Sequence, residues 1–304
     1  MTILATPTAA ELGEIARTLS EWQTSDWRGC LHPGDLGWHS MVGAERSASD
    51  LRCWTARGSI AAIGMFDGED LFRMAVEPSV AADDELADRI EADLSTHVLP
   101  PGTVTVEARG AYALQARLRA QGWDDDAPWT PLQLDLRSPV PANRRSAALR
   151  VEEIGLDAAG EWTAVHWSAF RGTTPSDEER RRLIRRWTTM ATGPFAHLAH
   201  HLIGYDGDDE PVVVTTVWTA GSGRPGLIEP MGVHRDHHGR GYGTAITLAG
   251  AQALRQYGAS AAAVVAENSN ASAFATYIAA GFAQSEPVAD LIRTRGRGAS
   301  ICSG

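Results

Sequence analysis

The sequence predicts a protein of the α/β class that is built from two tandem domains. Its 304 residues are about twice the length of a usual domain. Residues 137–147 contain two prolines and no hydrophobic periodicity, and they divide the chain near its middle. In both halves, short strand-like stretches alternate with stretches whose apolar residues have helical spacing. We therefore expect domains at residues 1–138 and 149–296, a linker at 139–148 and a tail at 297–304.

The second half begins with a strand and two helices. Residues 149–154 alternate in polarity as a strand does, and residues 158–170 repeat apolar side chains at helical spacing. Ser176 is a typical N-cap, and the acids at 177–179 suit the positive first turn of a second helix. The later residues predict strands at 200–205, 211–219, 227–233, 261–266 and 288–294, and helices at 244–257 and 271–279.

The first half has a similar order of elements in a weaker form. Residues 52–54 and 59–66 predict a hairpin, because two apolar stretches flank a short polar turn. The remaining patterns predict strands at 70–76 and 103–107 and helices at 84–94 and 112–120.

Composition narrows the classes of function. The net charge is −11, whereas a nucleic-acid partner requires a basic surface. No apolar run approaches the roughly 20 residues that span a membrane, and no secretory signal precedes the first domain, so we expect a cytoplasmic protein without a membrane partner. Cys30, Cys53 and Cys302 match no metal or redox spacing, and we expect no metal site.

A glycine-rich segment between a predicted strand and a helix can bind an anion. Gly239, Gly241 and Gly243 allow the backbone to approach a pyrophosphate, and the helix N-terminus adds partial positive charge. Arg240 could add a charge-assisted contact. Taken alone, this loop also fits a plain strand-to-helix turn. It matches neither a Walker loop, which needs Gly-Lys-Ser/Thr, nor a Rossmann fingerprint.

A second motif follows the next predicted strand. It runs from Asn270 to Phe282 and has the pattern Asn-x-x-Ala-x-x-x-Tyr-x-x-x-Gly-Phe. Together with His238-Gly-Arg-Gly-Tyr-Gly243, this half resembles the GNAT (GCN5-related N-acetyltransferase) superfamily. His238 departs from the family pattern, which has Gln or Arg there. The resemblance implies a mixed, mostly antiparallel sheet flanked by helices, and acetyl-CoA as the acyl donor. The residues that it implies for acetyl-CoA binding are Met231, Gly232, Val233, His238, Gly239, Arg240, Gly241, Tyr242, Gly243, Thr244, Asn270 and Ala273.

The resemblance also implies two catalytic residues. A tyrosine at the position of Tyr277 donates a proton to the leaving thiolate, although this ring could instead pack against the coenzyme arm. Glu229 stands on the strand before the loop and is the expected base or amine-binding carboxylate, with a purely structural strand end as the alternative. His234, His237 and His238 are competing bases. Backbone groups near Val233 are the expected oxyanion donors, and Asn270 either caps its helix or bonds the coenzyme arm.

The first half lacks a usable phosphate loop. Its counterpart, residues 76–85, contains no glycine and ends in three acids, which would repel a pyrophosphate. We expect a degenerate GNAT-like copy without a cofactor loop, and an unrelated α/β domain is the alternative. Six of the ten tryptophans lie in this half, either in its core or in a groove or interface.

These features favour an acetyl-CoA-dependent N-acetyltransferase. The expected partner is a small molecule with a primary amine, such as an antibiotic, an amino sugar or an amino acid derivative, and the chain acts as a monomer or homodimer. One alternative is mycothiol-synthase-like acetylation of a cysteinyl amine, since the tandem length is similar to that enzyme. Others are a protein amine as acceptor and a non-catalytic acyl-CoA sensor or partner-binding module.

Overall fold

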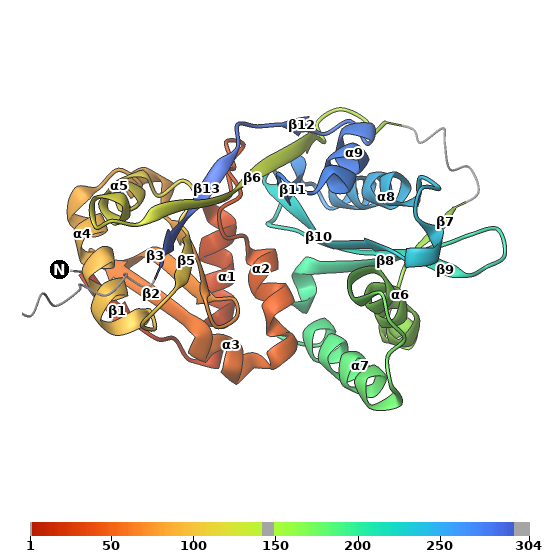
Figure 1. Ribbon diagram of the computed structural model, residues 1–304, viewed down its shortest axis with the longest axis horizontal. Coiled ribbons are helices and arrows are strands. Elements are labelled where there is room, and N and C mark those ends of the chain that lie inside the picture. The colour runs from red at the N-terminus through yellow and green to blue at the C-terminus, as the bar shows by residue number, and fades with distance from the viewer. Residues whose placement is uncertain (1, 142–148, 295–304) are drawn as a thin grey trace, which may run out of the picture.

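The computed structural model describes residues 2–141 and 149–294. Most of the expected linker, the expected tail at 297–304 and Cys302 lie outside the described residues. One continuous mixed sheet passes through both halves of the molecule, with helices packed on it (Figure 1). The strand order is β1-β2-β3-β4-β5-β13-β6-β11-β10-β9-β8-β7, and β12 pairs with β6 outside this path. The predicted α/β class is therefore confirmed.

The first half contains every element that the sequence predicted and several more. The strands are β1 (Thr2–Ala5), β2 (Leu51–Ala56), β3 (Ser59–Phe66), β4 (Leu71–Val76), β5 (Val104–Glu107) and β6 (Asp124–Asp135). The helices are α1 (Leu12–Glu21), α2 (Pro33–His39), α3 (Ala44–Asp50), α4 (Asp84–Asp93) and α5 (Tyr112–Ala120). Strand β6 escaped the sequence analysis because acids begin it and two prolines interrupt it, a composition that argues against a central strand.

The second half follows its predicted order closely. Its strands are β7 (Arg150–Glu153), β8 (Ala199–Tyr205), β9 (Pro211–Trp218), β10 (Pro225–Val233), β11 (Ala261–Glu267), β12 (Ala283–Gln284) and β13 (Val288–Arg293). Its helices are α6 (Ala159–Arg171), α7 (Asp177–Ala191), α8 (Tyr242–Gln256) and α9 (Ala271–Ala279). Ser176 caps α7 as predicted: its hydroxyl accepts from the Glu179 N–H, and the Glu179 carboxylate accepts the Ser176 N–H at 2.8 Å.

Each half contains a parallel strand pair connected by a helix. Strands β4 and β5 are parallel and joined through α4, and β10 and β11 are parallel and joined through α8. All other pairings are antiparallel among the described strands. The repeated order that the sequence indicated is therefore present in the structure.

The last strand crosses between the halves. The sequence order placed β13 at the end of the second unit, but it lies between β5 and β6 of the first half. Strand β6 makes this possible because it is long: its first part pairs with β13, and its second part pairs with β11. Figure 1 shows β13 and β6 running side by side between the two helical clusters. The two halves are therefore joined by backbone hydrogen bonds as well as by side chains.

Side-chain packing joins the halves at a second place. Helix α2 lies against Trp218 of β9, and a Cβ at Gly37 would stand 2.1 Å from that ring. Trp38, at the end of α2, contacts the rings of Trp162 and His166 on α6, with centroids 6.2 and 5.5 Å away. The tryptophans of the first half therefore occupy both of the expected places: Trp38 lies at the interface between the halves, whereas Trp54 and Trp123 pack in the core of the first half. No described helix is long and apolar enough to cross a membrane.

Candidate active site

The glycine-rich loop leads from β10 into α8, as the sequence predicted. Gly239 and Gly241 have φ values of +76° and +82°, in the left-handed region that favours glycine. A Cβ at either position would point into open space, so conformation rather than crowding requires glycine there. The loop therefore presents the free N–H groups of the first turn of α8 to a cleft.

This cleft encloses about 620 Å³ and collects nearly all of the predicted coenzyme residues. Of that set, only Arg240 is absent from its lining, and the Arg240 side chain is exposed. The His238 ring hydrogen-bonds to the Val233 carbonyl, with Nε2 3.0 Å from the oxygen. The Asn270 side chain caps α9 by accepting the Ala273 N–H at 3.0 Å, which is one of its two expected roles, and it also lines the cleft.

Strands β10 and β11 separate next to this cleft. They pair in parallel only from Pro225–Leu227 to Ala261–Ala263. Beyond that point β10 pairs with β9 alone, with a register shift between Ile228 and Met231. The side of Glu229–Val233 that faces β11 therefore has no strand partner. The backbone near Val233, for which the resemblance implied an oxyanion role, lies in this unpaired stretch.

A second cavity of about 600 Å³ adjoins the cleft and contains both predicted catalytic side chains. Tyr277 and Glu229 line this cavity, and Phe170, Met231, Asn270 and Ala273 line both spaces. The competing histidines do not reach it: none of the three lines the cavity, although His237 and His238 line the cleft. Among the described residues, no group of three or more His, Cys, Asp or Glu is placed to hold a metal ion.

The backbone of Glu229 is hydrogen-bonded by a side chain of the second half, and helix α2 of the first half packs on that side chain. The Trp218 indole N–H donates to the Glu229 carbonyl at 2.7 Å, and the Trp218 ring is fully buried under α2. The Glu229 side chain is half-buried, and among the described residues the only hydrogen bond to Glu229 from a side chain goes to its backbone carbonyl. Its carboxylate is therefore available to a ligand in the cavity.

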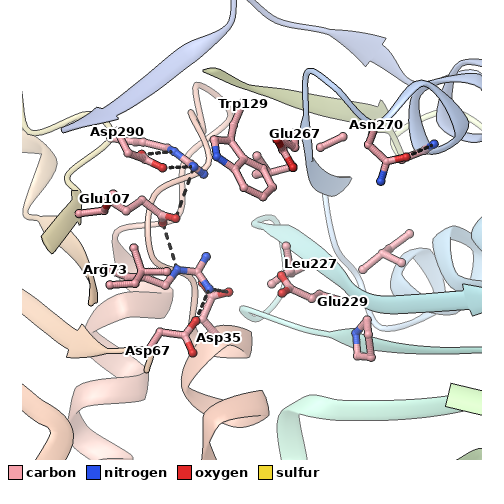
Figure 2. A pocket seen from close by; sticks show the side chains of 18 of the residues that line it. Asp35, Asp67, Arg73, Glu107, Trp129, Leu227, Glu229, Glu267, Asn270 and Asp290 are labelled. Atoms are coloured by element: carbon pink, nitrogen blue, oxygen red, sulfur yellow. Dashed lines mark hydrogen bonds and ion pairs between the residues drawn. The ribbon is translucent and has the colours of Figure 1, made fainter. Parts of the chain in front are cut away.

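The opposite wall of the cavity is a chain of ion pairs that the sequence analysis missed (Figure 2). Arg73 on β4 contacts Asp35 at 3.0 Å, Glu107 at 3.2 Å and Asp67 at 3.4 Å. Arg109 contacts Asp290 of β13 through two nitrogens, at 2.8 and 2.9 Å, and Glu107 at 3.4 Å. These residues come from separate segments of the chain around positions 35, 67–73, 107–109 and 290, and no local pattern marks them. The site is thus shared by both halves of the chain.

Burial changes the acid–base properties of these groups. It raises the pKa of Glu229, while the Arg73 guanidinium opposes the rise. Burial also raises the pKa of Asp35 to about 7 and of Asp290 to about 6, in each case against a neighbouring arginine. Burial and the Glu229 carboxylate raise the pKa of Tyr277 well above its ordinary value. The Tyr277 hydroxyl therefore keeps its proton at neutral pH, as the predicted role of proton donor requires, and the raised pKa of Glu229 is compatible with its predicted role as a base.

At the corresponding position of the first half, the described residues leave only a very small space. The space between the end of β4 and α5 encloses only about 10 Å³. The Ala113 N–H, in the first turn of α5, donates to the Ala81 carbonyl at 3.1 Å and so ties the helix to the loop that follows β4. Side chains and backbone fill the space that the second half leaves open.

Comparisons with known proteins agree with this architecture. Residues 161–282 match the acetyltransferase (GNAT) family, and no curated protein matches the chain. A solved tandem GNAT protein from the clavulanic acid biosynthesis pathway is 19% identical with a TM-score of 0.58, over 98% of this chain and 100% of that one. A GCN5-related N-acetyltransferase from Sphaerobacter thermophilus is 19% identical with a TM-score of 0.56, over 96% and 95% of the two chains. An acetyltransferase from Colwellia psychrerythraea is 10% identical with a TM-score of 0.58, over 96% and 98%. At these identities the structures establish the fold of the whole chain, and the family match concerns the second half.

Proposed function

Residues 161–282 match the acetyltransferase (GNAT) family and the chain has the fold of a tandem GNAT protein, and we propose on this basis that it transfers an acetyl group from acetyl-CoA to the primary amine of a small molecule. One observation carries this proposal: the cleft beneath the glycine loop opens into the cavity that contains Tyr277 and Glu229. A donor in the cleft and an acceptor in the cavity would meet at the four residues that line both spaces.

The residues of the chain have distinct roles in this reaction. Acetyl-CoA supplies the activated acyl group, and the first turn of α8 together with Gly239 and Gly241 would hold its pyrophosphate. Glu229 accepts a proton from the acceptor ammonium, so that the free amine can attack the acyl carbon. The unpaired backbone of β10 donates hydrogen bonds to the acyl oxygen as negative charge develops there. The Tyr277 hydroxyl donates a proton to the departing thiolate and regains one from the acylated nitrogen, which loses its second proton as the amide forms.

We further propose one donor site per chain. The first half has no cavity where the second half has its cleft, and its loop at 76–85 has no glycine. The first half acts instead on the acceptor side, because it supplies Arg73, Glu107 and Arg109 to the shared cavity.

Release of free thiol from acetyl-CoA, measured across a panel of small amines, tests the proposed reaction. We expect turnover with at least one amine, and a reduction of kcat by about 100-fold or more in Tyr277→Phe, the range typical of a lost general acid. Glu229→Gln should flatten the alkaline rise of kcat/KM with pH. Both variants should bind acetyl-CoA as the unaltered protein does. Tight binding of acetyl-CoA without thiol release for any amine would refute the proposed acetyl transfer and favour an acyl-CoA sensor.

A further inference from the structure

The acceptor cavity contains more carboxylates than its own arginines can neutralise. Its lining includes eight acidic side chains and two basic ones. Both arginines are already occupied: Arg73 has three carboxylate partners, and Arg109 has two as well as the carbonyl of Gly29 at 3.1 Å. Neither guanidinium is free to bind a carboxylate or phosphate of an acceptor, which argues against an anionic substrate.

Four of the acids lack a cationic partner within the described part of the chain. They are Asp70 and Asp126 from the first half, and Glu229 and Glu267 from the second. The Asp126 carboxylate is oriented by the Thr105 hydroxyl, which donates to it at 3.0 Å. Glu229 in the middle of β10 and Glu267 at the end of β11 both lie beyond the point where these strands separate. Figure 2 shows both glutamates across the cavity from the ion-paired wall. Uncompensated carboxylates therefore face the cavity from both of its sides.

Aromatic rings lie among these acids. Trp27, Trp129 and Phe170 also line the cavity, and the Arg109 guanidinium already lies 5.6 Å from the Trp129 ring centre. Indole faces attract organic cations, and they do so best where carboxylates are close and water is partly excluded. Carboxylates and aromatic faces together are the surroundings that an alkylammonium or guanidinium group prefers. A metal ion would require converging oxygen ligands instead, and the described residues contain no such group.

We infer that the acceptor is an organic compound with at least two positive charges, such as a diamine, a polyamine or a polyamino sugar. The amine that reacts lies against Glu229, and a second basic nitrogen lies against Asp126 and Glu267. This inference rests on the proposed function, because it assigns the cavity to the acceptor. The cavity then selects its acceptor by the positive charge at the end away from the reacting amine, rather than by the length or apolar surface of the acceptor.

Three probes of equal chain length separate charge from size: cadaverine, n-pentylamine and δ-aminovalerate, which end in an ammonium, a methyl and a carboxylate group. Binding of each to the protein loaded with coenzyme A is measured by calorimetry, so the result does not depend on turnover. We expect cadaverine to bind at least about tenfold more tightly than n-pentylamine, the effect of one added charged hydrogen bond. δ-Aminovalerate should bind most weakly.

The Asp126→Asn and Glu267→Gln variants locate the second charge. Each should reduce the preference for cadaverine over n-pentylamine about tenfold without changing the affinity for n-pentylamine. Glu69→Gln is the matched control, because Glu69 is exposed and outside the cavity lining. Equal binding of cadaverine and n-pentylamine, tightest binding of δ-aminovalerate, or a preference that survives both variants would overturn the inference. Selective binding of cadaverine without thiol release for any amine would overturn the proposed reaction and leave the inferred ligand class intact.

Discussion

Replacing Gly37 by alanine tests the contact between the halves at its tightest point. Gly37 lies in α2, and an added Cβ would stand 2.1, 2.6 and 2.7 Å from three atoms of the Trp218 ring. All three separations are far below a normal carbon–carbon contact of about 3.5–4.0 Å. The ring cannot turn away easily, because it is fully buried and its indole N–H holds the Glu229 carbonyl at 2.7 Å. Either α2 or Trp218 must therefore move.

The magnitude follows from two opposing effects. Overpacking a closed core costs about 1–3 kcal/mol, and more where the neighbours cannot shift. Alanine returns up to about 1 kcal/mol, because it is the better helix former. We expect a net loss of about 2 kcal/mol in the free energy of unfolding. Because displacement of Trp218 also moves the backbone of Glu229, kcat should fall, whereas the affinity for acetyl-CoA should change little.

Urea unfolding and thiol-release kinetics measure the two effects, and Gly13→Ala supplies the control. Gly13 lies in α1 with no atom within 4 Å of an added Cβ, so this variant should be unchanged or stabilised by up to about 1 kcal/mol. Equal stability and activity of the two variants would refute the packing of α2 on Trp218. A destabilised Gly37→Ala variant with unaltered kcat would refute the link from Trp218 to Glu229.

Three further outcomes are expected. Calorimetry should detect one acetyl-CoA per chain and none in Gly241→Glu, because a carboxylate at the loop would repel the pyrophosphate. Two binding sites per chain would refute the proposal that the first half binds no acetyl-CoA. Asp290→Asn, measured near pH 8, should lower the free energy of unfolding by about 3–5 kcal/mol, because it leaves the buried Arg109 without its main partner. The control Asp125→Asn breaks an exposed ion pair and should lower it by at most about 1 kcal/mol. Equal losses in the two variants would contradict the burial of the Arg109–Asp290 pair. Burial lowers the pKa of His201 from 6.5 to about 4, so as the pH falls the unfolded chain takes up a proton on this residue before the folded chain does. The free energy of unfolding should therefore fall between pH 6.5 and pH 4, by up to about 3 kcal/mol from His201. If His201→Gln has the same dependence of stability on pH, His201 does not contribute.

The sequence by itself determined the glycine-rich loop, the cap of α9 and most elements of the second half. These features are local. Gly239 and Gly241 adopt positive φ values that other residues disfavour, and Asn270 caps a helix through a residue three positions ahead. Such preferences act within one turn of the chain, so a short pattern reveals them. The predicted roles of Glu229 and Tyr277 stay predictions, although the structure brings both side chains into one cavity.

Only the tertiary structure decided what surrounds the acceptor. Arg109 and Asp290 are separated by 181 residues, and they meet because β13 inserts beside β6 rather than beside a strand of its own half. Strand pairing and burial of charge depend on the whole chain, since the free energy of a buried ion pair comes from partners at any sequence distance. Seen in sequence alone, Glu107 and Arg109 are ordinary charges at and just after the end of a strand, and β6 is a proline-containing connection. In the structure Glu107 and Arg109 belong to the ion-paired wall of the cavity, and β6 carries Asp126, one of the unpaired acids from which the class of acceptor is inferred.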